Sequence, residues 1–232
     1  MADRPLSGSR AGARLTPPAS RSAALVARCD DDLRRSASVR LITELTDGTV
    51  EAETFGRYLV AEHDFVRTAA RLAGYCLWQQ PDWPLAARHA ATVADLVGPQ
   101  EDYFAGLRAE WPVDDAAAAA VLADASVLRT TVTVALAEGG YPAVVASLAA
   151  AETLYLRWCT AAASASVARP AAVQRWIDLH VDPAFAAQVA FLHELLDDLP
   201  APVTDAELDR WFRAMLVAED AFHASPYAEV AR

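Results

Sequence analysis

The chain has 232 residues, of which 54% are hydrophobic, and a formal net charge of −11 at pH 7. This length allows one domain with a substantial core, and no change in composition divides its middle. The acidic balance argues against a nucleic-acid-binding protein, because such proteins depend on basic patches.

The cysteines and the apolar segments indicate the compartment. Cys29, Cys76 and Cys159 have neither metal-ligand spacing nor a disulfide pattern, which is typical of free thiols in a reducing compartment. Residues 1–22 contain no apolar run of the kind found in signal peptides, and we find no charge-free apolar stretch long enough to cross a membrane. We therefore expect a cytoplasmic protein that does not bind membranes.

The sequence divides into a tail and one helical region. Residues 1–22 are rich in Arg, Ser, Pro and Gly and are expected to form a disordered tail. Residues 23–232 are expected to form one all-helical domain, since apolar residues recur with a helical period and never alternate as in strands. Proline and glycine breakers predict helices at 23–46, 51–78, 84–95, 98–110, 114–138, 141–165, 170–180, 183–198 and 204–224. This pattern predicts an all-α fold, an irregular helical bundle.

Three of the predicted helices have a glutamate in the middle of an apolar stripe. Glu62 follows Leu59 and precedes Phe65, Glu152 lies between Leu148 and Tyr155, and Glu219 lies between Met215 and Phe222, all at helical spacing. A buried, unpaired carboxylate is costly, so each glutamate needs a partner or a role. Each one alone could pair with an arginine or a tyrosine and stabilise packing. Three at helix centres indicate a shared polar cavity between facing helices.

The histidines carry less information. His223 lies one turn after Glu219 on the same face, although a lone histidine of this kind is more often a core residue than a ligand. His63 points about 100° away from Glu62 around the helix. The remaining histidines show no metal spacing. The sequence also lacks a glycine-rich phosphate loop, a nucleophile elbow and the zinc-protease signature.

Three segments resemble the TenA (thiaminase II) family. Residues 45–67 (LTDGTVEAETFGRYLVAEHDFVR) are similar to its Leu-x-Asp-Gly-Thr-Leu turn and Phe-x-x-Tyr-Leu-x-Gln-Asp-Tyr helix. Residues 173–198 resemble its Trp-Ile helix and the following helix, and residues 218–227 resemble its closing Glu-x-x-Phe-Trp-x-x-Ala pattern. The resemblance implies a heme-oxygenase-like helical bundle that binds no heme and usually forms a homotetramer. We therefore expect a homo-oligomer, a dimer or a tetramer.

The resemblance also implies roles for individual residues. The family hydrolyses thiamin or its aminopyrimidine breakdown products at a C–N bond, using an aspartate, a cysteine and a late glutamate. The aspartate falls on Glu62, the late glutamate on Glu219 and the cysteine on Ala151. Glu152 and Tyr155 resemble the Glu-x-x-Tyr of the branch of the family that lacks the cysteine. Histidine at 223 replaces the family's tryptophan.

The leading hypothesis is hydrolysis of a C–N bond in an aminopyrimidine-like small molecule, without a cysteine nucleophile and without a cofactor. Its catalytic residues are Glu219 and Glu152, and its substrate-binding residues are Glu62, Tyr155, Phe65 and His223. One alternative is a non-heme iron oxidase that holds the metal with Glu62, Glu152, Glu219 and His223. Another is a catalytically inactive family member that binds a small ligand.

Overall fold

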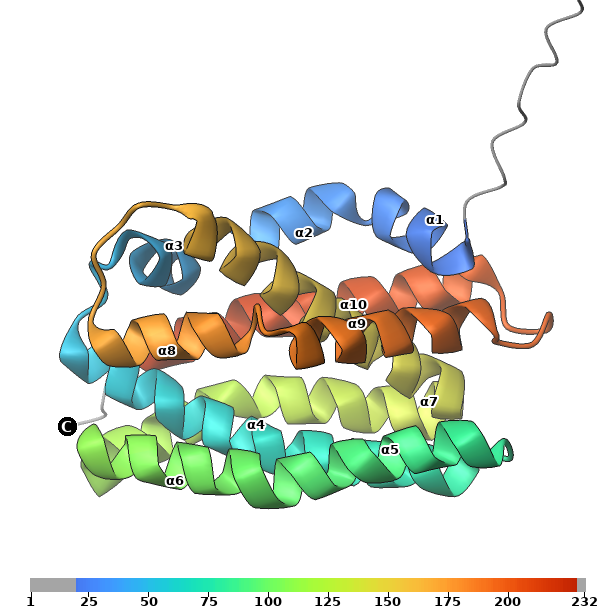
Figure 1. Cartoon of the computed structure of the whole chain (residues 1–232), viewed down its shortest axis with the longest axis horizontal. Coiled ribbons are helices and arrows are strands. Elements are labelled where there is room, and N and C mark those ends of the chain that lie inside the picture. Colours follow the sequence, from blue (N-terminus) through green and yellow to red (C-terminus); the bar gives the residue numbers. More distant parts are fainter. Residues whose placement is uncertain (1–19, 229–232) are drawn as a thin grey trace, which may run out of the picture.

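In the part of the chain that the computed structural model describes, residues 20–228, the secondary structure consists of helices without strands (Figure 1). The predicted all-α fold is therefore confirmed. Of the tail expected at residues 1–22, residues 1–19 lie outside the described range. Helix α1 already begins at Arg21, with Ser20 as its N-cap.

The prediction of one helix over residues 23–46 is wrong, because this region forms three short helices. They are α1 (Arg21–Arg28), α2 (Asp30–Ser36) and α3 (Arg40–Asp47). The first break is at Cys29, and before α3 the chain is extended at Val39. Neither break contains a glycine or a proline. The turns allow each helix to bury its own leucines, including Leu25 and Leu33, in the core.

Two long helices form the centre of the bundle, α4 (Ala52–Gln79) and α7 (Asp115–Ser164). Helix α7 is interrupted at Gly140, whose φ of 59° and ψ of −145° are non-helical. A residue with a Cβ atom is strongly disfavoured in this conformation. The predicted boundary between residues 138 and 141 is therefore confirmed. The break at Gly140 lets the second half of α7 run in a different direction from the first half.

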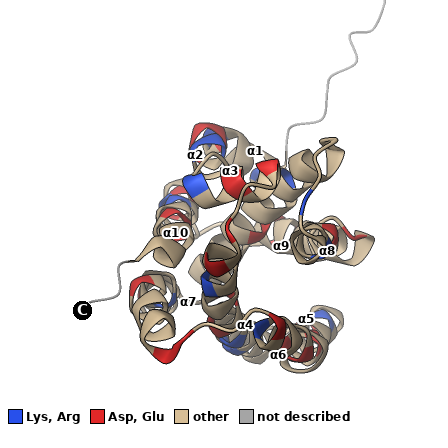
Figure 2. Ribbon diagram, turned by 90° about the vertical axis from the view of Figure 1, so that its left-hand side faces the viewer, with Lys and Arg blue, Asp and Glu red and all other residues tan. Residues whose placement is uncertain are grey.

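The remaining helices cover this centre (Figure 1). Helix α5 (Trp83–Asp95) continues through a π-helical turn (Leu96–Gln100) into α6 (Glu101–Glu110) alongside α4. Helices α8 (Ala171–Leu179) and α9 (Pro183–Asp197) follow each other on another side, and α10 (Asp205–Ala224) packs along α7 before a short 3₁₀ turn (Ser225–Tyr227). Acidic and basic residues occur together on outer helices such as α2 and α10 (Figure 2).

Side-chain caps fix where the helices begin. Asp82, Asp114 and Asp182 each accept a hydrogen bond from a backbone amide in the first turn of α5, α7 and α9. The predicted capping box of α10 is confirmed, because the Thr204 hydroxyl accepts from the amide of Glu207 and the Glu207 carboxylate accepts from the amide of Thr204. These caps fix the first turns of α5, α7, α9 and α10, whereas α4, which carries Glu62, begins without a side-chain cap.

Helix α7 is the described helix that could cross a membrane by length and composition, with a mean hydropathy of 1.5 over its most apolar 18-residue window. The sequence analysis expected no such stretch without charges, and α7 does contain Asp124 and Arg129 in its first half. It also bends at Gly140 and packs along α4, α9 and α10. We therefore describe it as a helix of the bundle.

Candidate active site

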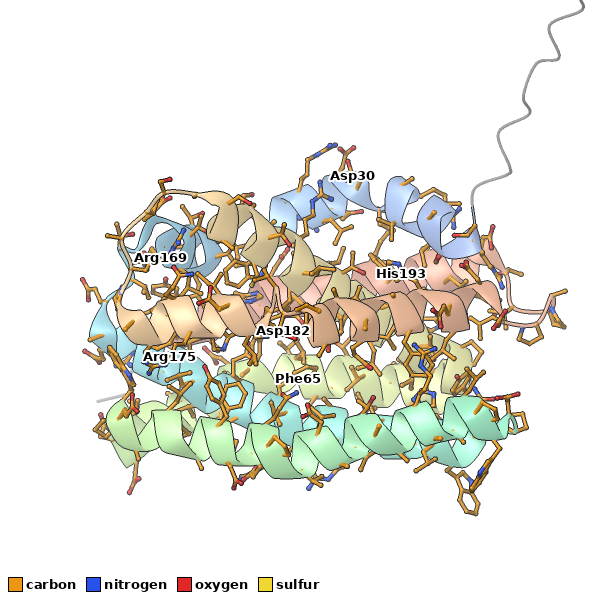
Figure 3. All side chains as sticks on the ribbon, viewed as in Figure 1. Asp30, Phe65, Arg169, Arg175, Asp182 and His193 are labelled. Carbon is orange, nitrogen blue, oxygen red and sulfur yellow. The ribbon has the colours of Figure 1, made fainter. Side chains whose placement is uncertain are left out.

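A cavity of about 570 Å³ lies between α4, α5, the second half of α7 and the α8–α9 junction. Most of its wall is apolar, and its polar groups are few, as is usual for small-molecule sites. Aromatic rings from four helices contribute to the wall, namely Phe65, Phe104, Tyr155 and Phe185. Figure 3 shows Phe65 in the space between the α5–α6 layer and the α8–α9 layer, with Asp182 at the α8–α9 junction.

Glu62 projects from α4 to this cavity and is held by a tyrosine. Its side chain is buried, and the Tyr155 hydroxyl donates to its Oε1 atom at 2.6 Å. Burial raises the pKa of Glu62 to about 7, against the lowering effect of hydrogen bonds from Tyr155 and Tyr58. Near neutral pH the carboxyl group is thus divided between its protonated and ionised forms.

Glu152 lines the same cavity from α7, one turn before Tyr155. Among the described residues, no hydrogen bond or ion pair holds its carboxylate. Burial, together with the charge of Glu62, raises the pKa of Glu152 to about 7. Two carboxyl groups of similar acidity therefore face one cavity from two helices.

Glu219 lies behind this cavity and does not line it. The side chain is 1% exposed, and neither carboxylate oxygen has a hydrogen-bond partner among the described residues. Burial holds its pKa well above the usual range, and the charges of Glu62 and Glu152 add to this effect. The three glutamates predicted to converge thus interact electrostatically, although only Glu62 and Glu152 reach the cavity wall.

His223 also lies behind the cavity wall. Its Nδ1 atom is 2.8 Å from the backbone carbonyl of Glu219, and its Nε2 atom is 3.2 Å from the Tyr155 hydroxyl. Burial lowers the pKa of His223 to about 4. The imidazole is therefore neutral near neutral pH, and it contacts the cavity only through Tyr155.

His180 is a polar group of the cavity wall that the sequence analysis did not select. It caps the C-terminus of α8, its ring stacks on Trp176 with centroids 3.9 Å apart, and its Nδ1 atom donates to the Trp176 carbonyl at 2.8 Å. Burial lowers the pKa of His180 to about 4. The Nε2 atom of this neutral ring is then a hydrogen-bond acceptor. No spacing in the sequence could signal this role, because it depends on the α8–α9 turn.

Ala151, to which the resemblance assigns the position of the family's cysteine, lines the cavity. The nearest thiol along the helix, Cys159, is fully buried and is not part of the cavity wall. Burial holds the pKa of Cys159 well above its usual range. It therefore remains a thiol, which is a poor nucleophile.

The described residues do not contain a group of three His, Cys, Asp or Glu side chains that could hold a metal ion. His63, on the same helix as Glu62, points elsewhere and lies 3.0 Å from the carboxylate of Glu101. It stacks on Phe104. This agrees with the helical phase that separates His63 from the glutamates.

Comparisons with known proteins agree with this fold. A TenA homologue from P. horikoshii OT3 superposes with a TM-score of 0.74 at 13% identity, covering 90% of this chain and 99% of that chain. A TenA homologue from Pyrococcus furiosus superposes with a TM-score of 0.73 at 17% identity, covering 89% of this chain and 100% of that chain. A TenA family transcription regulator from Silicibacter sp. TM1040 superposes with a TM-score of 0.70 at 18% identity, covering 91% of this chain and 96% of that chain. At these identities the likeness shows a shared fold.

Sequence comparison identifies the family. A search of curated protein sequences gave no significant match. The profile of the TENA/THI-4/PQQC family, in contrast, matches residues 40–228, which is most of the chain and includes all three glutamates. The chain therefore belongs to the TENA/THI-4/PQQC family.

Proposed function

We propose that the protein hydrolyses a C–N bond of an aminopyrimidine or a related thiamin-breakdown product, without a covalent intermediate. Membership of the family suggests a thiamin-related hydrolase or a regulator. The observation that carries the proposal is that Glu62 and Glu152 line one cavity from facing helices. We also retain the predictions of a homo-oligomer and a cytoplasmic location, which sedimentation analysis and cell fractionation can test.

The polar groups of the cavity suit an aminopyrimidine. Such a ring presents an amine and a ring nitrogen side by side, and a carboxyl group can meet this edge with two hydrogen bonds. The neutral His180 adds an acceptor for a further N–H group. Phe65 and Phe185 supply flat apolar surfaces for the ring faces. A volume of about 570 Å³ is large enough for a single substituted ring.

The reaction needs proton transfer more than it needs a nucleophilic side chain. Water forms a new C–O bond as the C–N bond breaks, one proton leaves the attacking water, and one proton joins the departing amine. Carboxyl groups with a pKa of about 7, such as those of Glu62 and Glu152, can both accept and donate protons near neutral pH. The charges of Glu62 and Glu152 in turn raise the pKa of Glu219 behind them, so the ionisation of Glu219 depends on theirs.

Ligand binding without turnover is a second candidate. Ala151 leaves the cavity without the nucleophile that the family resemblance would supply. The similar protein from Silicibacter sp. TM1040 is described as a transcription regulator. In this case the glutamates would hold a ligand, and the ligand would change contacts with a partner.

A binding screen followed by a turnover assay tests both candidates. Aminopyrimidines with aminomethyl or formylamino substituents, and thiamin itself, would be screened by thermal melting and then assayed for ammonia or amine release. We expect Glu62→Gln to weaken binding and Glu152→Gln to lower turnover about 100-fold. Glu138→Gln, at an exposed carboxylate, is the matched control. Binding without release supports the second candidate, and the absence of any binding contradicts both.

A further inference from the structure

A hydrogen-bonded chain leads from the cavity into the core. The Tyr155 hydroxyl is 2.6 Å from Glu62 Oε1 and 3.2 Å from His223 Nε2. The Tyr58 hydroxyl lies 3.2 Å from the Tyr155 hydroxyl. These four side chains come from α4, α7 and α10, and all are buried. Glu62 and Tyr155 line the cavity, whereas His223 lines a separate hollow of about 260 Å³ with Asp220 and Tyr227.

The hydrogens of this chain can be assigned by counting donors and acceptors. The Glu219 carbonyl can only accept, so the His223 Nδ1 atom that lies 2.8 Å from it carries a hydrogen. In a neutral ring the Nε2 atom then has a lone pair and needs a donor. The only group close to it in the hydrogen-bond network of the described residues is the Tyr155 hydroxyl. That hydroxyl has one proton and cannot donate it to both Glu62 and His223.

Two arrangements satisfy every group. In one, Glu62 is ionised and accepts from Tyr155, while a protonated His223 donates from Nε2 to the Tyr155 oxygen. In the other, Glu62 carries the proton and donates it to Tyr155, and Tyr155 donates to His223. In both, the Tyr58 hydroxyl can donate to the Tyr155 oxygen or to Glu62. The arrangements contain the same number of protons and differ by the shift of two protons, each along one hydrogen bond.

We infer that Glu62, Tyr155 and His223 form a proton relay, in which His223 stores a proton that Glu62 removes from the cavity. The inference extends the proposed function, since it gives the proton taken from the attacking water a place to go. A proton bound by Glu62 moves to Tyr155 as the proton of Tyr155 moves to His223, and the reverse shift delivers it to the departing amine. No family motif assigns this role, because the resemblance places a tryptophan of the family at the position of His223.

The surroundings of Glu62 and His223 determine where the proton of the relay rests. Glu62 faces Glu152, Tyr155 and Cys159 of α7 and Glu219 of α10, with Tyr58 on its own helix. His223 faces the Glu219 carboxylate, whose Oε2 atom is 3.8 Å from Nδ1, and it shares its hollow with Asp220, Arg40 and Tyr227. Burial lowers the pKa of His223 to about 4 and raises that of Glu62 to about 7, so the proton rests on Glu62 and reaches His223 only transiently during turnover.

Nitrogen NMR of histidine-labelled protein tests the relay without any substrate. We expect the chemical shift of His223 Nε2 to change with pH as Glu62 titrates, with a midpoint of about 7. When Glu62 is ionised, the Tyr155 hydroxyl donates to Glu62 and no longer to His223. Tyr155→Phe and Glu62→Gln should each abolish this titration. His193, whose Nε2 atom is 2.9 Å from the Thr153 hydroxyl, serves as the internal control. A His223 titration that persists in Tyr155→Phe, or that is absent in the unaltered protein, overturns the inference.

A turnover measurement separates the relay from the proposed function. If an aminopyrimidine is hydrolysed, His223→Ala should lower kcat about tenfold with little change in KM, and free imidazole in the adjoining hollow should restore part of it. His63→Gln is the matched control, since its ring lies outside the relay. Unchanged kcat in His223→Ala rejects the relay and leaves the hydrolase. NMR coupling without hydrolysis of any candidate supports the relay and rejects the hydrolase.

Discussion

The carboxylates on the surface and those in the core of this bundle are in opposite situations. On the surface, Asp209 lies 2.7 Å from Arg28 and Asp30 lies 2.6 Å from Arg157, and the chain contains no lysine, so every such pair uses arginine or histidine. In the core, none of the arginines of the described range forms an ion pair with Glu62, Glu152 or Glu219.

This difference reverses the direction of the pKa shifts. The hydrogen bond from Arg157 lowers the pKa of Asp30, whereas burial raises the pKa values of Glu62 and Glu152 to about 7. The surface carboxylates are therefore fixed anions near neutral pH, and the core carboxylates exchange protons. A core carboxylate without a counter-charge decreases stability, and for this reason we propose a role in binding or catalysis for these glutamates.

The largest expected effect comes from Glu219. Glu219→Gln should lower turnover about 100-fold or more while ligand binding changes little, because the residue acts on proton transfer from behind the cavity wall. The assay is amine release under saturating substrate, with a melting shift as the measure of binding. Asp209→Asn, a change on the surface, is the control. Undiminished turnover in Glu219→Gln would remove Glu219 from the catalytic residues.

A smaller effect concerns the pH dependence of binding. A permanently cationic N-methylated aminopyrimidinium should bind more tightly as pH rises towards about 7, by up to tenfold per pH unit, because it needs an ionised carboxylate. Above this pH the affinity should level off. Calorimetric titration at several pH values measures the slope, and Glu62→Gln should reduce it. A flat profile between about pH 5 and pH 8 would mean that neither Glu62 nor Glu152 contacts the ligand.

The helical period explains how much of this arrangement could be predicted. The apolar stripes correctly predict that Glu62 and Glu219 are buried, and Gly139-Gly140 correctly predicts the break in α7. The breaks at Cys29 and before Val39 could not be predicted, since neither contains a breaker residue. They depend on how α1, α2 and α3 each pack against the core, which is tertiary information.

The site shows the same division between local and tertiary information. Periodicity gives the face of a helix but not its depth, so it could not distinguish Glu62 and Glu152 on the cavity wall from Glu219 behind it. His180 reaches the cavity through a turn between helices and leaves no periodic signal. The links from Tyr155 to Glu62 and to His223 join residues far apart in the sequence.

A third prediction measures what the core carboxylates cost in stability. The folded-state pKa of Glu62 is about 7, above the ordinary glutamate value of 4.5, so the folded protein binds more protons than the unfolded chain between these pH values. The free energy of unfolding therefore falls as pH rises through this range. Glu62→Gln should raise it at pH 8 by about 1–3 kcal/mol and leave it nearly unchanged at pH 4. Urea denaturation at both pH values measures the difference.

The opposite sign would contradict this interpretation. If Glu62→Gln were destabilising at pH 8, its hydrogen bond from Tyr155 would contribute more than burial costs, and Glu62 would be a structural residue. Tyr155→Phe separates the two contributions, because it removes the hydrogen bond and keeps the carboxyl group.

The smallest effect is expected at the surface. The Arg28 guanidinium donates to both carboxylate oxygens of Asp209, yet both side chains are partly exposed. A double-mutant cycle of Arg28→Ala and Asp209→Ala should give a coupling free energy of about 0.2–1 kcal/mol, because solvent screens the pair and ordering two side chains has an entropic cost. The coupling should weaken at high salt. A coupling free energy well above this range would mean that surface ion pairs contribute strongly to the stability of this bundle. The contrast between the paired surface carboxylates and the core glutamates would then no longer support a functional role for the glutamates.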